Sequence, residues 1–145
     1  KKGMLYLTDP NMTRFNILLE EGVDMVLWAL KNTLGGEIFV PKIPSYKLLD
    51  LAKAICKNSK IKITGIRPGE KMHEELITIT DGANTIDRGQ YYVITQDKEK
   101  YMTKCDELKI SYKKVLPEFS YKSDTNTSFL SEVEIKNLIK NQIIN

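Results

Sequence analysis

KIKITGIRPGEKMHEEL, residues 60–76, contains a strand pattern, a turn and a charged segment in one continuous run. Lysine and isoleucine alternate from Lys60 to Ile63, which predicts a strand within residues 60–66 with its isoleucines toward a core and its lysines in water. The Arg-Pro-Gly sequence that begins at Arg67 predicts a turn, and the glutamates that follow it predict a short helix over residues 70–76. A strand, a turn and a helix N-terminus in this order can bring backbone N–H groups and a guanidinium to one anion, such as a diphosphate.

Arginine is rare in this chain, so the places where it occurs are informative. Of the 22 basic residues, arginine stands only at positions 14, 67 and 88. Its planar guanidinium can hold a phosphate through two parallel hydrogen bonds, which lysine cannot do. Arg67 could therefore bind a diphosphate, or it could pair with Glu70 or Glu74 in a solvated turn. Arg14 leaves the same two alternatives open, with the Glu20-Glu21 pair as its acidic partner.

The remaining elements follow from hydrophobic spacing and from the residues that begin or end helices. Apolar residues at helical spacing predict a helix over residues 17–34, which Gly35-Gly36 ends and which places Trp28 in the core. Ser45 is the predicted N-cap of a second helix that runs to Ile55. Further expectations are a turn over 8–11, strands over 37–40 and 91–95, a loop over 81–89, a solvated lysine-rich stretch over 98–114, and a final helix that opens with a Ser131-x-x-Glu134 capping box. An inventory of about four helices and three or four short strands predicts a mixed α/β chain.

Composition excludes several classes of protein. The 145 residues are 41% hydrophobic and 28% charged with a net charge of +3, which is typical of one soluble globular domain. The longest apolar run, Met25–Leu30, is far shorter than the roughly 18 residues of a membrane span. Acidic residues dilute the lysine-rich stretch, so we expect no nucleic-acid partner. Because the chain shows no secretion signal and has only Cys56 and Cys105 as cysteines, we expect it to work in the cytoplasm.

The residues also lack the signatures of cofactor and metal chemistry. No glycine-rich dinucleotide or P-loop motif occurs, and no tyrosine is followed four residues later by lysine. His73 is the only histidine, and with two distant cysteines it does not make a zinc site. It could act as a general base, or it could make a structural hydrogen bond. Because no partner pair is evident that would tune His73 for catalysis, we expect no catalytic residue in this chain, and we expect no metal ligand and no cofactor site.

Four segments taken together resemble one protein family: MTRF at 12–15, GGEIFVPK at 35–42, LAKA at 51–54 and GIRPGEKMHEE at 65–75. They are similar to the inverting UDP-N-acetylglucosamine 4,6-dehydratases, within the polysaccharide-biosynthesis group of extended short-chain dehydrogenases. The resemblance implies that residues 1–145 are a single α+β lobe, the C-terminal substrate-binding part of such an enzyme, without its NADP-binding Rossmann domain. Pro68 and the Val-Pro-Lys-Ile-Pro run resemble the branch that starts pseudaminic-acid synthesis for flagellin glycans.

The resemblance also implies roles for individual residues. In the family, NADP takes a hydride from C4 of the sugar and returns it at C6 after loss of water, and every group for these steps belongs to the Rossmann domain. Arg14 and Arg67 resemble the arginines that hold the UDP part of the substrate, with Arg67 on the diphosphate. Glu70 resembles a nucleoside contact or a brace for Arg67, and Asn126 is a further substrate-binding candidate.

A lobe without its Rossmann domain lacks one wall of the site, so we expect the chain alone to be inactive and to bind UDP-sugar weakly. Its start, Lys1-Lys2-Gly3 without a methionine, fits a piece of a longer enzyme. Expected partners are the UDP-sugar, the Rossmann domain of the same enzyme and further copies in a homo-oligomer. The alternative is a non-catalytic assembly or binding module that keeps the fold of the lobe and covers an exposed apolar surface by self-association.

Overall fold

The computed structural model describes residues 3–143, and its contacts divide the chain into two compact units. Unit 1 consists of residues 1–16, 44–74 and 122–145, and unit 2 consists of residues 17–43 and 75–121. Each unit contains both helices and strands, which confirms the predicted mixed α/β class. No helix in the described range is both long enough and apolar enough to span a bilayer.

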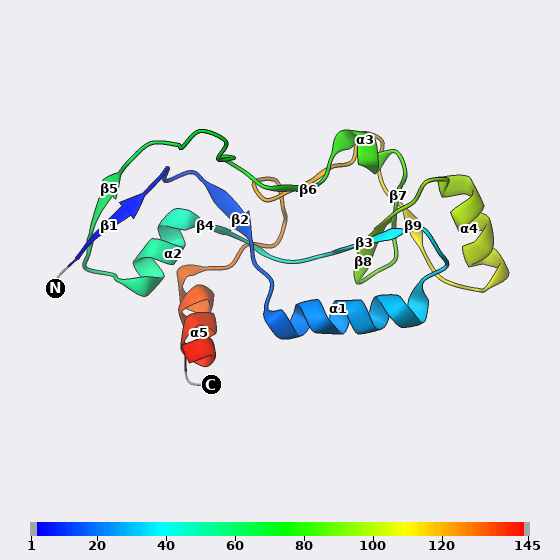
Figure 1. Cartoon of the computed structure of the whole chain (residues 1–145), viewed down its shortest axis with the longest axis horizontal. Coiled ribbons are helices and arrows are strands. Elements are labelled where there is room, and N and C mark those ends of the chain that lie inside the picture. Colours follow the sequence, from blue (N-terminus) through cyan, green and yellow to red (C-terminus); the bar gives the residue numbers. More distant parts are fainter. Residues whose placement is uncertain (1–2, 144–145) are drawn as a thin grey trace. The chain divides into compact units, whose positions relative to one another are not determined.

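Unit 1 contains a parallel strand pair and a separate antiparallel pair (Figure 1). β1 (Met4–Leu7) and β5 (Lys60–Ile63) pair in parallel, and α2 (Leu48–Ile55) packs against β1. β2 (Thr13–Phe15) and β4 (Ser45–Lys47) form the antiparallel pair. The buried apolar residues of this unit are Leu7, Met12, Ala54 and Ile135.

The final helix of unit 1 begins as predicted. α5 (Glu132–Ile143) packs on α2, and Ser131 immediately precedes its first residue. The Glu134 carboxylate accepts hydrogen bonds from the Ser131 N–H at 2.8 Å and from the Ser131 hydroxyl at 2.6 Å, and the Ser131 Oγ accepts one from the Glu134 N–H at 3.3 Å. These bonds stabilise the charged carboxylate and lower the pKa of Glu134. The capping box is confirmed.

Three predictions for unit 1 are wrong. Ser45 is a fully buried residue of β4, and Lys47 is the N-cap of α2 instead. Ile63 is 50% exposed, because a sheet of two strands buries less of each strand than a larger sheet does. Residues 70–76 form no helix. The carbonyls of Lys71 and Met72, which a helix would use internally, accept hydrogen bonds from an arginine of β2.

Unit 2 is built on a four-stranded antiparallel sheet (Figure 1). The order of its strands is β3 (Ile38–Pro41), β8 (Tyr91–Ile94), β7 (Thr85–Asp87) and β9 (Lys113–Lys114), so the predicted strands over 37–40 and 91–95 are confirmed. α4 (Lys98–Glu107) packs on the sheet through a buried core of Ile86, Val93, Tyr101, Met102 and Cys105. The shorter elements are β6 (Glu75–Ile77), which pairs with β10 (Tyr121–Lys122), and α3 (Ile79–Gly82).

The first helix, α1 (Leu19–Asn32), confirms the predicted helix over 17–34 but is less buried than expected. Trp28 packs edge-on against Phe39 with ring centroids 5.2 Å apart, and against Tyr91 at 4.5 Å. No residue of α1 is fully buried, so Trp28 lies at the edge of the core and not inside it. The helix leaves five large apolar side chains exposed: Leu19, Val23, Val26, Leu27 and Leu30.

Two stretches of unit 2 are more ordered than the sequence predicts. The expected loop over 81–89 contains β7, in which Ile86 is fully buried. The lysine-rich stretch over 98–114 contains α4, which is a core helix and not only a solvated face. Both stretches are polar overall, and each is buried through a few apolar residues spaced to lie on one face of a strand or helix. Their composition therefore does not reveal that they contain β7 and α4.

Candidate functional site

The guanidinium of Arg14 joins β2 to the segment that follows the Arg-Pro-Gly turn. Its Nη1 donates to the carbonyl of Thr13 at 2.7 Å and to that of Met72 at 3.1 Å. Its Nη2 donates to the carbonyl of Lys71 at 2.9 Å and to Sδ of Met12 at 3.0 Å. Four of the five N–H groups of Arg14 are therefore engaged before any ion pair is considered.

Two glutamates complete the surroundings of Arg14. Its Nε lies 3.3 Å from Glu74 Oε1, and its Nη2 lies 3.9 Å from Glu70 Oε1. The arginine side chain is only 20% exposed, so these carboxylates act on it with little screening by water. All five N–H groups thus face acceptors within unit 1, and the acidic partners are Glu70 and Glu74 in place of the Glu20-Glu21 pair.

Arg67 has a different environment. Its carbonyl accepts a hydrogen bond from the Glu70 N–H at 3.0 Å, and Glu70 Oε2 accepts one from the Arg67 N–H at 3.2 Å. Gly69 has a φ of +80° in this turn, a value that glycine adopts without strain. The Arg67 side chain is exposed, and within residues 3–143 no hydrogen bond or ion pair engages its guanidinium. Glu70 therefore braces the Arg67 turn with one oxygen and approaches Arg14 with the other.

A buried pair of hydroxyl groups connects β2 to two other segments of unit 1. Thr13 Oγ1 lies 2.8 Å from Nδ1 of His73 and 2.7 Å from Oγ of Ser123. The Glu74 N–H donates to Ser123 Oγ at 2.9 Å. Thr13 is 3% exposed and Ser123 is fully buried. His73 thus makes a structural hydrogen bond, one of the two alternatives that the sequence left open.

Asn126 orders the loop between β10 and α5. Its Nδ2 donates to Ser45 Oγ at 3.0 Å, and its Oδ1 accepts from the Ser128 N–H at 3.4 Å. The backbone of Ser45 bonds the same loop through the carbonyl of Ser128 and the N–H of Leu130. These contacts hold Asn126 beside β4.

The four predicted site residues all belong to unit 1, but they make two sets of contacts. The contacts described above join Arg14, Arg67 and Glu70 in one cluster and join Asn126 to β4. Within the described part of the chain, no three histidine, cysteine or acidic side chains gather closely enough to hold a metal ion. Arg67 is the member of the cluster whose guanidinium is exposed to an anion, whereas the guanidinium of Arg14 already faces the carboxylates of Glu70 and Glu74.

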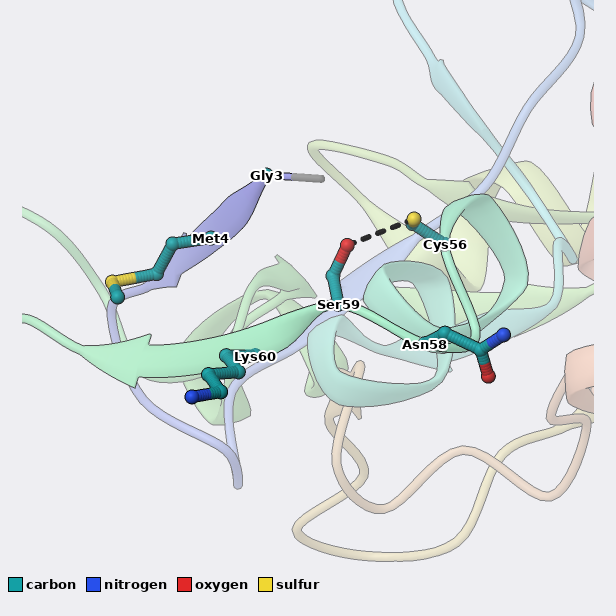
Figure 2. Close-up of a pocket in the computed structure, with 6 residues that line it drawn as sticks. All are labelled: Gly3, Met4, Cys56, Asn58, Ser59 and Lys60. Carbon is teal, nitrogen blue, oxygen red and sulfur yellow. Dashed lines mark hydrogen bonds between the residues drawn. The ribbon is translucent and has the colours of Figure 1, made fainter. Parts of the chain in front are cut away.

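A cavity of about 460 Å³ lies elsewhere in unit 1, where β1 and β5 begin and α2 ends (Figure 2). It is lined by Gly3, Met4, Cys56, Asn58, Ser59 and Lys60. The Ser59 hydroxyl donates to Sγ of Cys56 at 2.8 Å across the lining. None of the four predicted site residues lines this cavity.

Comparison with known proteins identifies the family. A family model described as polysaccharide biosynthesis protein matches residues 1–96. The chain belongs to this family. The match includes Arg14, Arg67 and Glu70, and it confirms the family that the four motif segments indicate.

The individual relatives that the chain resembles are longer than the chain itself. The UDP-N-acetylglucosamine 4,6-dehydratase (inverting) of Campylobacter jejuni is 44% identical over 140 residues, which cover 93% of the chain and 42% of the relative. A UDP-glucose 4-epimerase of Rickettsia bellii is 36% identical over an alignment of 146 positions, which covers 94% of the chain and 41% of the relative. The X-ray structure of Pen from Bacillus thuringiensis has a TM-score of 0.74 and 30% identity, over 98% of this chain and 42% of that one. The chain thus spans about two fifths of the length of each of these relatives.

The sequence indicates Arg14 and Arg67 as candidate site residues, but it does not indicate the groups that hold Arg14 in place. Thr13 and Ser123 carry no motif, and their contact joins residues that are 110 positions apart. The acceptors of Arg14 are mostly backbone carbonyls, which every residue has. No sequence signal could therefore distinguish the engaged Arg14 from the exposed Arg67 in this family member.

Proposed function

We propose that the chain is the UDP-sugar-binding lobe of a C5-inverting UDP-N-acetylglucosamine 4,6-dehydratase, a cytoplasmic enzyme of the pseudaminic-acid branch. The 44% identity to the Campylobacter jejuni dehydratase supports the reaction class. In this proposal the Rossmann domain, its NADP and the catalytic groups come from another part of the enzyme, and the chain is inactive without them. The product is a 4-keto-6-deoxy UDP-sugar.

We propose that NADP binds outside the described residues of this chain. β1 is followed by a turn that contains Pro10, where a dinucleotide site would have a glycine-rich turn that opens a helix. The Asp9 carboxylate closes that turn by accepting a hydrogen bond from the Asn11 N–H at 2.7 Å. An anionic side chain in this position repels a pyrophosphate, so the proposal assigns no step of NADP chemistry to the chain.

The exposed guanidinium of Arg67 is the observation that carries the proposal. It stands on a turn that Glu70 closes from both directions, so the backbone beneath it is fixed before a ligand arrives. A diphosphate can accept two hydrogen bonds from such a guanidinium. Arg14 supports the site by holding the adjacent segment, and its own N–H groups would have to leave protein acceptors to reach a ligand.

Reconstitution tests the proposal. The chain is produced together with the segment of the Campylobacter jejuni dehydratase that it does not cover, and formation of the 4-keto sugar is measured. We expect the pair to form product and Arg67→Ala to lower kcat/KM by roughly tenfold to a hundredfold, the worth of a charge-assisted hydrogen bond. Lys71→Ala, which removes a neighbouring exposed cation, is the matched control and should leave the rate unchanged. Equal rates for Arg67→Ala and the unmodified chain would overturn the role of Arg67.

A second candidate, an assembly module, is favoured by the exposed apolar side chains of α1. Leu19 is 81% exposed and Leu30 is 72% exposed, on a helix that has no fully buried residue. Such a face is usually covered by another protein surface. If a second copy covers it, sedimentation should give a mass near twice 16.6 kDa. Leu27→Lys should then return the monomer, whereas a monomer at every concentration of the unmodified chain would reject this candidate.

A further inference from the structure

The hydrogen bonds around Thr13 form a connected series from a backbone N–H to the only imidazole of the chain. The Glu74 N–H lies 2.9 Å from Ser123 Oγ, which lies 2.7 Å from Thr13 Oγ1, which lies 2.8 Å from Nδ1 of His73. The two hydroxyl groups are buried, so water does not complete their hydrogen bonding. Each hydroxyl must therefore place its single hydrogen on a neighbour in the series.

The series has a direction because its first member can only donate. Ser123 Oγ accepts from the Glu74 N–H, and the only other partner described for Ser123 is Thr13, so its own hydrogen goes to Thr13 Oγ1. Thr13 then directs its hydrogen to Nδ1 of His73, which must be an unprotonated acceptor. In the opposite direction, Nδ1–H would donate to Thr13 and the hydrogen of Ser123 would be left without an acceptor in a fully buried position.

We infer that this series fixes His73 as the neutral tautomer with its proton on Nε2, and that this N–H donates to an acceptor oxygen of the bound UDP-sugar. The second part rests on the proposed function. Within residues 3–143, Nε2 has no hydrogen-bond partner, although the side chain is only partly exposed. His73 belongs to the segment that Arg14 holds through the carbonyl of Met72, and its ring is held at Nδ1 by Thr13. Arg67 precedes His73 by six positions in the sequence, and both residues belong to unit 1.

The tautomer can be measured directly because the chain has one histidine. Nitrogen-15 NMR of the ligand-free chain should show one protonated ring nitrogen with the coupling pattern of Nε2–H. Thr13→Val, which removes the acceptor and donor beside Nδ1, should shift both nitrogens toward the values of a free, exchanging imidazole. Thr13→Ser keeps a hydroxyl there and should keep the original pattern. A protonated Nδ1 in the unmodified chain, or a Thr13→Val spectrum identical to it, would overturn the direction of the series.

Titration with UDP-N-acetylglucosamine tests the donor role. Nε2 of His73 should shift in proportion to occupancy, in a titration that Arg67→Ala abolishes. His73→Gln retains an amide donor near the position of Nε2, whereas His73→Asn places its amide near Nδ1. We expect affinity to fall roughly fivefold more in the asparagine variant than in the glutamine variant, the worth of one neutral hydrogen bond.

The possible failures are distinguishable. Binding that depends on Arg67 but leaves Nε2 unmoved would overturn the donor role of His73 and leave the proposed function intact. Equal weakening by His73→Gln and His73→Asn would likewise reduce His73 to a structural residue. Because the chain alone is expected to bind UDP-sugar weakly, the titration is repeated on the chain reconstituted with the complementary dehydratase segment. No binding of millimolar ligand by that pair would overturn the donor role together with the proposed function, while the ligand-free spectrum would still decide the tautomer.

Discussion

Gly82→Ala should destabilise the chain by about 3 kcal/mol, because the added methyl group has no space. Gly82 is the buried last residue of α3, and a Cβ built on it would lie 1.9 Å from the carbonyl oxygen of Phe119 and 2.9 Å from its carbon. Both of these atoms belong to backbone, so no side-chain rotation relieves the contact. The N–H of Gly82 also donates to the carbonyl of Thr78 at 2.8 Å, which restrains α3 from moving away.

The same substitution elsewhere provides a matched control. Gly22 lies inside α1, where nothing stands within 4 Å of an added Cβ, and alanine favours a helix over glycine by about 0.5–1 kcal/mol. Gly22→Ala should therefore stabilise the chain slightly. Urea denaturation followed by circular dichroism compares the two variants with the unmodified chain. Similar midpoints for Gly82→Ala and Gly22→Ala would show that the close approach of Phe119 is relieved at little cost.

This contrast shows which part of the fold is local in origin. The spacing of apolar residues in 17–34 and the Ser131-x-x-Glu134 capping box predict α1 and α5, because both patterns act within a few residues. The role of Gly82 depends on Phe119, which is distant in the sequence and contributes only backbone atoms. A glycine that is required for space is therefore indistinguishable in the sequence from one, such as Gly22, that is not.

The wrong predictions have a common physical cause, which is competition from distant partners. Ser45 has the residue type of an N-cap, but its hydroxyl accepts from Asn126 and its backbone joins the loop before α5. Residues 70–76 are rich in helix-forming residues, but Arg14 takes two of their carbonyls. Intrinsic preferences of this size, well below 1 kcal/mol per residue, are easily outweighed by several hydrogen bonds to a charged group.

The candidate site was predictable only as a set of residue types. Arginine in a lysine-rich chain marks Arg14 and Arg67 as special, and the family match includes both. The family resemblance implies either a nucleoside contact or a brace for Arg67 at Glu70, and in the structure Glu70 accepts a hydrogen bond from the backbone N–H of Arg67. Which arginine is available to a ligand depends on carbonyls and carboxylates of another segment, so only the structure separates the two.

Arg14→Met should destabilise unit 1 by about 2–4 kcal/mol, whereas Arg67→Met should change stability by no more than about 0.5 kcal/mol. Methionine keeps much of the aliphatic bulk of arginine but removes every donor. The carbonyls of Lys71 and Met72 and the carboxylate of Glu74 would lose their partner together, and the 20% exposure of Arg14 allows water to replace only part of it.

Arg14→Lys separates charge from geometry in the same experiment. An ammonium keeps the attraction to Glu74 but has three donors on one atom, and it cannot reach the spread of acceptors that the planar guanidinium reaches. Its midpoint in urea should therefore fall between those of Arg14→Met and the unmodified chain. If Arg14→Met and Arg67→Met unfold at the same urea concentration, Arg14 does not hold this segment, and its guanidinium becomes as available to a diphosphate as that of Arg67.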